Sequence, residues 1–268
     1  MPTLNIDGKI ILYADDTSIL VNADTYEQLE VKIGNAMSQC GDWFRANGLK
    51  LNSDKTSVVL FNTGRSNVKL QVPLETNLVL QTENGVKLLG FHIDSALTWN
   101  QHVDVVCKKM ARGIFALRQL KTLVSSDSLK ETYYAYVHSM LSYGIILWGC
   151  CTEHEHILEM QKRAIRILIG AKFRETCREH FKDQSILTSV SVYIIEVIMY
   201  VRNNINEFEL RSKPNPRHPK RALDLIPTSH RLRLAKRSPN AMGCILYNKL
   251  PYCIQNIKSY NVFRLRLI

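Results

Sequence analysis

Near Thr98 the apolar pattern of this 268-residue chain changes its period. Before that point, short β-prone runs alternate with polar, Gly-containing or Pro-containing segments, and after it the apolar residues recur almost wholly at helical spacing. Strands gathered in one part and helices in another are typical of the α+β class. We expect a mixed α/β segment at 1–95, a helical segment at 96–170 and a basic helical segment at 171–268.

The first two β-prone runs, residues 9–14 and 17–22, flank the pair Asp15-Asp16. Two apolar runs joined by turn residues predict a tight antiparallel hairpin, here with both acids at its tip. The mixed segment continues with shorter strand-like runs at 49–51, 57–61, 68–72, 78–81 and 86–93.

Helical spacing predicts one helix inside the mixed segment and several after it. Thr25 and Gln28 form a capping-box pattern at the start of the first helix, and Gly48 lies where a C-terminal cap belongs. The next helix begins near Thr98 and ends near Leu120, with an apolar stripe made of Val103, Val106, Cys107, Met110, Ile114 and Leu117. Further helices are expected at 127–143, 154–169, 186–205, 239–249 and 259–267.

Charge is distributed unevenly along the chain, whose formal net charge is +11. Residues 1–100 hold 8 Lys and Arg against 11 Asp and Glu, whereas residues 101–268 hold 27 against 13. The steepest segment, 211–237, has Asp224 as its one acid. This balance is typical of proteins that bind a polyanion, because Lys and Arg displace counterions from phosphates. A solvated basic surface has the same composition, so charge alone leaves both interpretations open.

Composition and the first residues exclude several classes of protein. The chain is 46% apolar and 22% charged, as in ordinary globular proteins and unlike disordered or fibrous ones. Its seven Cys are unevenly spaced, which indicates reduced intracellular thiols and not a disulfide framework. We expect no signal peptide, because residues 1–9 lack a basic region and an apolar one, and we expect no membrane span or membrane partner. The expected location is intracellular, with nucleus and cytoplasm left open.

Asp15 and Asp16 are the strongest candidates for chemistry. Mg²⁺ prefers oxygen ligands and typically takes one or two protein carboxylates together with substrate phosphates. In two-metal phosphoryl transfer, one ion activates the attacking oxygen and the other stabilises the leaving oxygen. Asp is also a favoured turn residue, so without its flanking sequence this pair would indicate an acidic turn.

The flanking sequence is more specific. Tyr13-Ala14-Asp15-Asp16 after an apolar strand resembles motif C of the reverse transcriptase palm. Residues 48–56, with the core Asn52-x-x-Lys55-Thr56, resemble motif D, and residues 86–94, with their Leu-Gly pair, resemble the motif E hairpin or primer grip. Their order and spacing agree with the family. Blocks similar to the tail of non-LTR (LINE-type) retrotransposon polyproteins lie at 141–149, 161–166 and 247–251, and within these elements we favour the jockey-like group.

The resemblance implies an RNA-directed DNA polymerase that uses an RNA template, a DNA primer or target, deoxynucleoside triphosphates, and Mg²⁺ or Mn²⁺. It also implies a partial palm at 1–95 and a helical thumb at 96–170, followed by the basic C-terminal region. Asp15 would be the metal-binding aspartate, with Asp16 beside it at the same site. Lys55 would lie near the triphosphate, where the motif D lysine is proposed to protonate departing pyrophosphate.

The resemblance also assigns binding residues. Tyr13 and Ala14 would lie beside the primer 3′ end and the incoming nucleotide. The primer would be placed by Leu88, Leu89 and Gly90. The thumb would contact the duplex backbone through Lys108, Lys109 and Arg112. In the basic segment 211–237 the candidates for nucleic-acid contact are Arg217, Lys220 and Arg221.

One part of the family pattern is absent. In reverse transcriptases a further metal-binding Asp in motif A, and the nucleotide-handling motif B, precede motif C, but only fourteen residues precede Asp15 here. Asp7 is the one acid among them, and we expect it in a turn at the far end of the hairpin. The isolated chain is therefore expected to lack polymerase activity. The alternatives are a non-catalytic remnant that binds nucleic acid and a scaffold that pairs through open palm strands.

Other clusters carry weaker signals. Zinc-compatible residue types occur at Cys150, Cys151, His154 and His156, but adjacent cysteines rarely ligate one ion together, and Cys177 with His180 lacks a second pair. Aromatic residues in helices more often pack in the core than stack on bases. We therefore expect packing roles for Tyr133, Tyr134, Tyr136, Trp43, Trp99 and Trp148.

Overall fold

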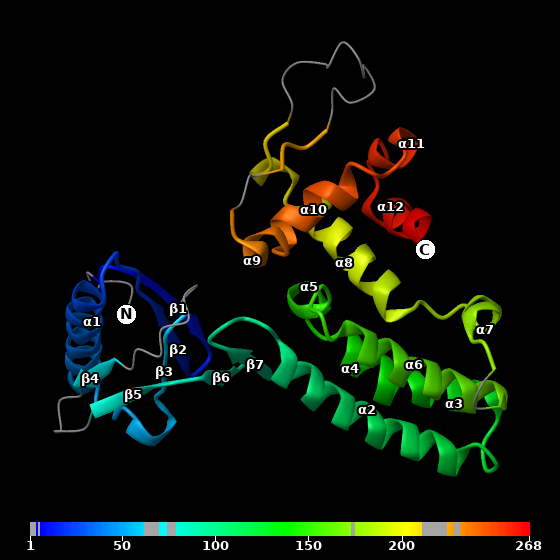
Figure 1. The fold of residues 1–268 in the computed structure, drawn as a ribbon, viewed down its shortest axis with the longest axis horizontal. Coiled ribbons are helices and arrows are strands. Elements are labelled where there is room, and N and C mark those ends of the chain that lie inside the picture. Colours follow the sequence, from blue (N-terminus) through cyan, green and yellow to red (C-terminus); the bar gives the residue numbers. More distant parts are fainter. Residues whose placement is uncertain are drawn as a thin grey trace. The chain divides into compact units, whose positions relative to one another are not determined.

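The computed structural model describes residues 4, 6–61, 70–73, 79–172, 175–210, 224–227 and 231–268. They form two compact units, Met1–Leu97 and Thr98–Ile268, so the chain divides where its periodicity changes. Figure 1 shows strands with one long helix in the first unit and helices throughout the second. The predicted boundary at residue 170 lies inside the second unit.

An antiparallel hairpin opens the first unit. Strand β1 (Lys9–Tyr13) pairs with β2 (Asp16–Leu20), and Tyr13 lies opposite Asp16 in the register. The predicted hairpin is confirmed, but its tip lies one residue earlier than predicted. The two-residue loop consists of Ala14 and Asp15, and Asp16 is already the first residue of β2. Ala14 has φ +50, which propensity does not anticipate because a Cβ disfavours this region.

Helix α1 (Tyr26–Ala46) follows the hairpin. Thr25 is its N-cap, and the Thr25 Oγ1 accepts a hydrogen bond from the backbone N–H of Gln28 at 3.3 Å. Gly48 follows the C-terminal end with φ +68, a conformation that a residue without Cβ adopts at little cost. Both predicted ends of this helix are confirmed.

Small sheets complete the first unit. Strands β3 (Val58–Val59), β4 (Gln71–Pro73) and β5 (Val79–Glu83) form one sheet with β5 in the middle, parallel to β3 and antiparallel to β4. Strands β6 (Gly85–Leu88) and β7 (Phe91–Asp94) form a second hairpin. The predicted run at 86–93 is therefore a pair of strands, as the motif E resemblance implies.

The predicted strand at 49–51 is wrong. The N–H of Leu49 bonds to the carbonyl of Phe44 as α1 closes, and the 3₁₀-helix η1 (Ser53–Lys55) begins soon after. Between them, the side chain of Asn52 accepts a hydrogen bond from the N–H of Asp54. Local turn bonds to an Asn side chain compete with a sheet ladder and replace it here.

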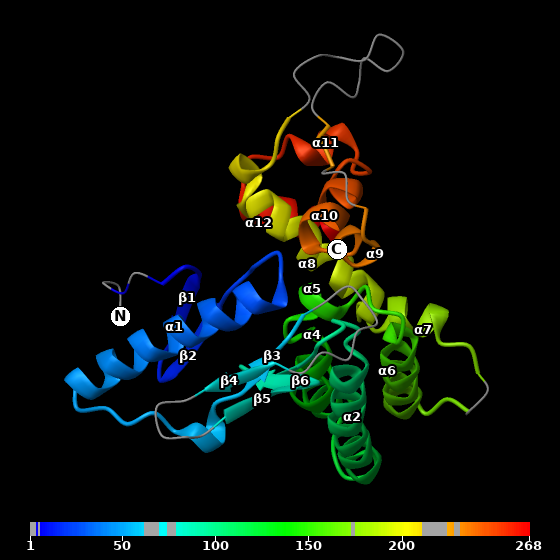
Figure 2. The same cartoon turned by 60° about the vertical axis from the view of Figure 1, so that its left-hand side comes forward.

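Helix α2 (Asn100–Leu120) begins the second unit. Its inner face carries the predicted apolar stripe, and Figures 1 and 2 show that this helix lies along α6 (His154–Ile169), with which it packs. The N-cap is Trp99 and not the predicted Thr98, although the Thr98 Oγ1 accepts a hydrogen bond from the N–H of Asn100 at 3.4 Å. The stripe residues at most 5% exposed are Val103, Val106, Met110, Ile114 and Leu117.

The predicted single helix at 127–143 is divided. Helix α3 (Ser126–Tyr133) continues into a π-helix, η2 (Tyr134–His138), and then into α4 (Ser139–Ser142). Four residues of an α-helix turn by about 400°, so a stripe with a spacing of four would drift about 40° per step. The wider π turn compensates for this drift and keeps one buried face, made of Leu129, Tyr133, Val137 and Leu141.

The remaining elements complete the second unit. α5 (Ile145–Trp148) and α10 (Pro239–Tyr247) pack against α8 (Ser189–Asn203). The helix predicted at 154–169 is α6, and Gly170 follows its end with φ +72. No helix in the described ranges has the length and apolar character needed to cross a membrane. The shorter elements are α7 (Arg178–Asp183), η3 (Ile205–Glu207), α9 (Arg233–Lys236), α11 (Tyr252–Gln255) and α12 (Tyr260–Leu267).

Two features hold the second unit together. A cluster around α8, α10 and α12 buries Ile198, Val201, Leu225, Cys244, Tyr247 and Phe263. The other feature is Gln161 on α6, which is fully buried. Its Nε2 donates to the Tyr133 hydroxyl and the Leu187 carbonyl, and its Oε1 accepts from the N–H of Ser189, each at 2.8 Å. This amide therefore links α3, α6 and the start of α8.

Candidate functional site

The hairpin tip is held in an unusual backbone conformation. Ala14 is the first residue of the two-residue loop and has φ +50. A positive φ at this position is typical of the turns that close hairpins, but Gly, Asn or Asp normally occupies it. A residue with a Cβ is strained there by about 1–2 kcal/mol. Such strain is concentrated at functional sites, so Ala14 marks this tip as a candidate.

The tip presents two adjacent carboxylates. Asp15 lies in the loop, Asp16 begins β2, and both residues are exposed. Their oxygens are the kind of ligand that Mg²⁺ or Mn²⁺ prefers. Asp7 lies at the other end of the hairpin, as predicted, where its carboxylate pairs with the Lys32 ammonium at 2.8 Å. The described residues contain no group of three or more metal-ligating side chains, so the tip fits part of a metal site and not a complete one.

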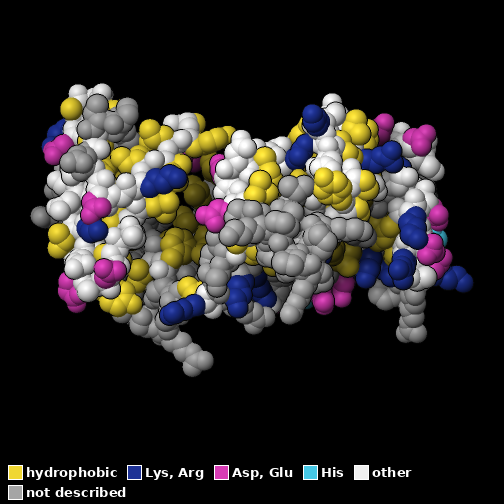
Figure 3. Space-filling view, turned by 90° about the horizontal axis from the view of Figure 1, so that it is seen from above, with side chains coloured by type: hydrophobic (Ala, Val, Ile, Leu, Met, Phe, Trp, Pro, Cys, Tyr) yellow, Lys and Arg dark blue, Asp and Glu magenta, His cyan; other side chains and the backbone are white. Residues whose placement is uncertain are grey.

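The strands behind the tip are apolar and exposed. Among the described residues β1 and β2 pair only with each other. Ile11, Leu12, Tyr13 and Leu20 are between 44% and 64% exposed, and Figure 3 shows apolar side chains on the surface at the left, where the first unit lies. A two-stranded hairpin with open edges and apolar faces is marginally stable alone and pairs readily with further strands.

Lys55 and the second hairpin lie in the same unit. Lys55 ends η1 and is exposed, and its side chain forms no hydrogen bond or ion pair with the described residues. Leu88 ends β6, and the loop between β6 and β7 consists of Leu89 (φ +47) and Gly90 (φ +84). Two positive φ values make a tight turn that exposes Leu89 to 41%.

On α2 the predicted cations lie on the surface. Lys108, Lys109 and Arg112 are exposed and form no ion pairs in the described part of the chain. Two of these cations, Lys109 and Arg112, border an open hollow of about 350 Å³, whose other lining residues are Gly113, Ala116, Tyr136 and Met140. This hollow was not visible in the sequence because one side comes from α2 and the other from η2 and α4.

The three neighbouring tyrosines have different environments. Tyr133 is fully buried, and burial raises the pKa of its phenol. Tyr134 is 39% exposed and Tyr136 is 57% exposed. The predicted packing role is therefore confirmed for Tyr133 and wrong for Tyr136, because the π turn moves residue 136 off the buried face. The spacing of four between apolar positions was the sequence signal that could have revealed it.

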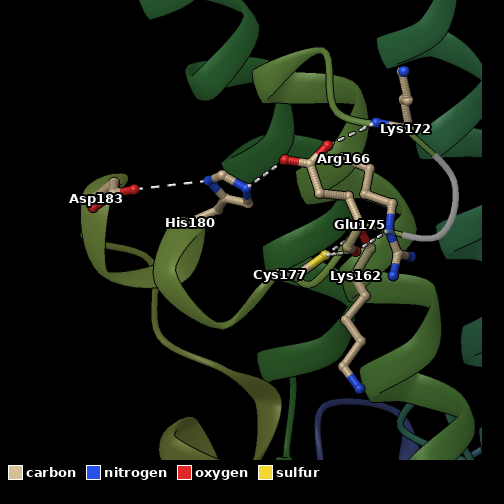
Figure 4. Close-up of polar contacts among 7 residues, drawn as sticks. All are labelled: Lys162, Arg166, Lys172, Glu175, Cys177, His180 and Asp183. Atoms are coloured by element: carbon tan, nitrogen blue, oxygen red, sulfur yellow. Dashed lines mark hydrogen bonds and ion pairs between the residues drawn. The ribbon is translucent and has the colours of Figure 1, made fainter.

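In the described part of the chain, the histidines and cysteines considered as zinc ligands form contacts within the fold. Figure 4 shows His180 between Glu175 and Asp183, while the Cys177 sulfur points to the backbone carbonyl of Lys162 at 3.7 Å. Arg166 Nε donates to the Glu175 carbonyl, and the Lys172 N–H donates to the Glu175 carboxylate. These contacts join the end of α6 to the residues that precede α7.

The other zinc-compatible cluster is also structural. The Cys150 sulfur donates to the carbonyl of Arg237, and burial raises the pKa of the Cys151 thiol to about 11. His154 is buried, and its Nε2 lies 3.0 Å from the Ser189 hydroxyl. These contacts engage the sulfur and imidazole atoms within the fold, and the described residues contain no group of three side chains that could hold a metal ion. Three further candidates for nucleic-acid contact, Arg217, Lys220 and Arg221, lie outside the described residues.

Comparison with curated proteins finds a relative of this chain. The chain is similar to the probable RNA-directed DNA polymerase from transposon BS of Drosophila melanogaster, with 25% identity over 167 residues. The match covers 60% of this chain, and the chain spans 18% of the relative's length. No family model and no solved structure matches the chain. The predicted resemblance to the reverse transcriptases of transposable elements is confirmed by this relative.

Proposed function

We propose that this relative of a transposon RNA-directed DNA polymerase supplies the metal-binding hairpin and a nucleic-acid-holding helical region of such an enzyme, encoded by a non-LTR retrotransposon. The observation that carries the proposal is the tip at Tyr13-Ala14-Asp15-Asp16, where a strained turn presents two adjacent carboxylates. In the complete enzyme the hairpin would belong to the palm and α2 to the thumb. The partners would be an RNA template, a DNA primer or target, and deoxynucleoside triphosphates.

Each proposed catalytic group has a chemical task. Asp15 and Asp16 would bind Mg²⁺ or Mn²⁺, and the bound metal would stabilise charge on the attacking and leaving oxygens of nucleotidyl transfer. Lys55 is exposed and its ammonium has no partner among the described residues, which leaves it available to protonate pyrophosphate. Tyr13 and Ala14 would border the primer end and the incoming nucleotide.

The isolated chain is proposed to be inactive as a polymerase. Two carboxylates lie at the tip, Asp7 is engaged by Lys32, and the described residues provide no cluster of three ligands. Catalytic groups that act as a unit lose nearly all of their effect when one is missing. A third carboxylate and a nucleotide pocket would have to come from another segment.

Primer extension tests this proposal directly. The full chain is incubated with an RNA template annealed to a DNA primer, deoxynucleoside triphosphates and Mg²⁺ or Mn²⁺, and no incorporation is expected. Incorporation that Asp15→Asn abolishes would contradict the inactivity and support the role of Asp15.

Sequencing the transcript upstream of the Met1 codon separates the alternatives. An open frame with an Asp-bearing motif A supports a polymerase, whereas a stop codon or an unrelated exon supports a remnant.

A second candidate function is nucleic-acid binding without catalysis. The exposed and unpaired Lys108, Lys109 and Arg112 on α2 favour it. Because each neutralised phosphate releases counterions, log affinity for RNA or DNA should fall linearly with log salt. Neutralising the basic residues of 211–237, or those on α2, should flatten that slope. Binding that does not depend on salt would instead favour a scaffold that pairs through the exposed β1–β2 strands.

A further inference from the structure

The hollow between α2 and η2 combines an apolar floor with a cationic rim. Its lining includes the apolar residues Gly113, Ala116 and Met140, here called the floor, together with Tyr136. Lys109 and Arg112 lie one turn apart on the rim, and neither forms an ion pair with the described residues. The hollow is open to solvent, and a charged side chain that has no partner is ready to receive an anion.

Gly113 fixes the geometry of this hollow. A Cβ at residue 113 would lie 2.7 Å from the Tyr136 carbonyl oxygen and 3.0 Å from the Tyr136 Cβ. The backbones of α2 and η2 are therefore in direct contact at this point, and the absence of a side chain on Gly113 is what allows this close approach. Main-chain packing therefore fixes where Tyr136 lies against α2, although its side chain is exposed.

The π-helix explains why an aromatic ring is available there. The N–H of Ser139 bonds to the Tyr134 carbonyl, five residues back, so the turn contains one more residue than an α-helical turn. Tyr133 and Val137 remain in the core, and Tyr136 is left 57% exposed. Single π turns are enriched at functional sites. The π turn has poorer hydrogen-bond geometry than an α-helical turn, and it leaves Tyr136 exposed in the lining of the hollow that also contains Lys109 and Arg112.

We infer that this hollow is a subsite for one unpaired nucleotide of a single-stranded nucleic acid, with the base against the Tyr136 ring and a neighbouring phosphate on Lys109 and Arg112. A base has a planar apolar face that stacks on aromatic rings, and its phosphate supplies the negative charge that the rim lacks. In a duplex each base face is covered by its neighbours, so this mode requires an unpaired base. The inference deepens the proposed function, on which it rests.

Fluorescence anisotropy of the full chain with labelled oligothymidylate tests the stacking. Tyr136→Ala should weaken binding about tenfold, because stacking of one base contributes about that factor. Tyr136→Phe keeps the ring and should bind like the parent. An oligomer of abasic sites retains phosphates but offers no base, so Tyr136→Ala should leave its affinity unchanged. Tyr252→Ala is the matched control, because Tyr252 on α11 is 60% exposed and lies outside the hollow.

The rim is tested by salt dependence. The double variant Lys109→Gln/Arg112→Gln should reduce the slope of log affinity against log salt by about 0.7, because one single-strand phosphate contact is lost. Arg178→Gln/Lys182→Gln, on the exposed surface of α7, is the matched control and should change the slope less. Equal affinities of Tyr136→Ala and the parent for oligothymidylate would overturn the subsite and leave the proposed nucleic-acid role intact. Failure of the parent to bind any oligonucleotide at low salt would overturn both.

Discussion

The candidate residues of the two units lie on elements that differ in how well they are packed. In the first unit, Asp15 and Asp16 lie at the tip of a two-stranded hairpin whose apolar side chains are largely exposed. In the second unit, Lys109, Arg112 and Tyr136 lie on helices whose inner faces are fully buried. A marginal hairpin becomes rigid only when further strands or another element cover it. The helices of the second unit are held by their own buried faces and need no further element. Substitutions should therefore change stability more in the helical unit than at the hairpin tip.

The largest expected effect concerns the support of the helical unit. Gln161→Leu removes three hydrogen bonds and leaves the Tyr133 hydroxyl and the Ser189 N–H buried without a partner. Each orphaned group costs about 1–3 kcal/mol, so the free energy of unfolding should fall by about 3 kcal/mol. Urea titration, followed by the helical circular dichroism signal, measures this change in the free energy of unfolding.

Gln119→Leu is the control for that experiment. Gln119 is exposed on α2, so its substitution should change stability by less than about 0.5 kcal/mol. If Gln161→Leu lost no more than this control, buried hydrogen bonds would not be what makes the helical unit rigid, and the contrast with the hairpin would disappear.

A pair of glycine substitutions should change stability in opposite directions. Gly113→Ala places a Cβ 2.7 Å from the Tyr136 carbonyl oxygen, and such overpacking costs about 1–3 kcal/mol. Gly34→Ala, in the middle of α1, meets no atom within 4 Å and should stabilise that helix by about 0.5–1 kcal/mol. Thermal unfolding measures both, and a neutral Gly113→Ala would show that α2 and η2 can separate freely.

Many features of both units could be predicted from local sequence signals. The capping pattern at Thr25, the stripe of α2 and the end of the helix predicted at 154–169 all depend on residues close together in the chain, and each is confirmed. A helix needs only its own amphipathic face and caps to be recognised. The β1–β2 hairpin was predicted for the same reason, since turn residues separate two apolar runs.

What the sequence missed depends on contacts between distant residues or on strain. Local propensity favours Asp15-Asp16 as the turn, whereas the structure places Ala14 in the loop at a disfavoured φ. Gln161 gives no pattern that distinguishes it from a surface glutamine, because its partners lie on α3 and before and at the start of α8. The hollow beside Tyr136 requires both the π turn and its contact with Gly113, neither of which propensity reports.

Acid should weaken the helical unit through His154, which is buried, and His138, which is partly buried. Burial lowers the pKa of His154 and of His138, and the Nδ1 of each ring has no hydrogen-bond partner among the described residues. The unfolded chain therefore binds more protons than the folded one below the ordinary histidine pKa of about 6.5, and stability should fall as the pH decreases through that value.

Thermal unfolding of the helical signal between pH 7 and pH 5 measures this effect. The variant His154→Gln should lose part of the pH dependence, because its side chain does not titrate in that range. Stability that rose on acidification, or a slope unchanged in His154→Gln, would contradict the assignment to this residue.

The smallest expected effect is the relief of strain at the hairpin tip. Ala14→Gly removes the Cβ that disfavours φ +50, and the gain should exceed the entropic cost of Gly by about 1 kcal/mol or less. Because the hairpin opens locally, amide hydrogen exchange of β1 and β2 is the suitable measurement, and exchange should become slower by up to about fivefold. Ala111→Gly, on the exposed face of α2, is the control and should destabilise its helix by about 1 kcal/mol. Faster exchange in Ala14→Gly would mean that Ala14 is not strained in this turn. The tip would then be an ordinary acidic loop, and the argument from strain to metal-binding function would fail.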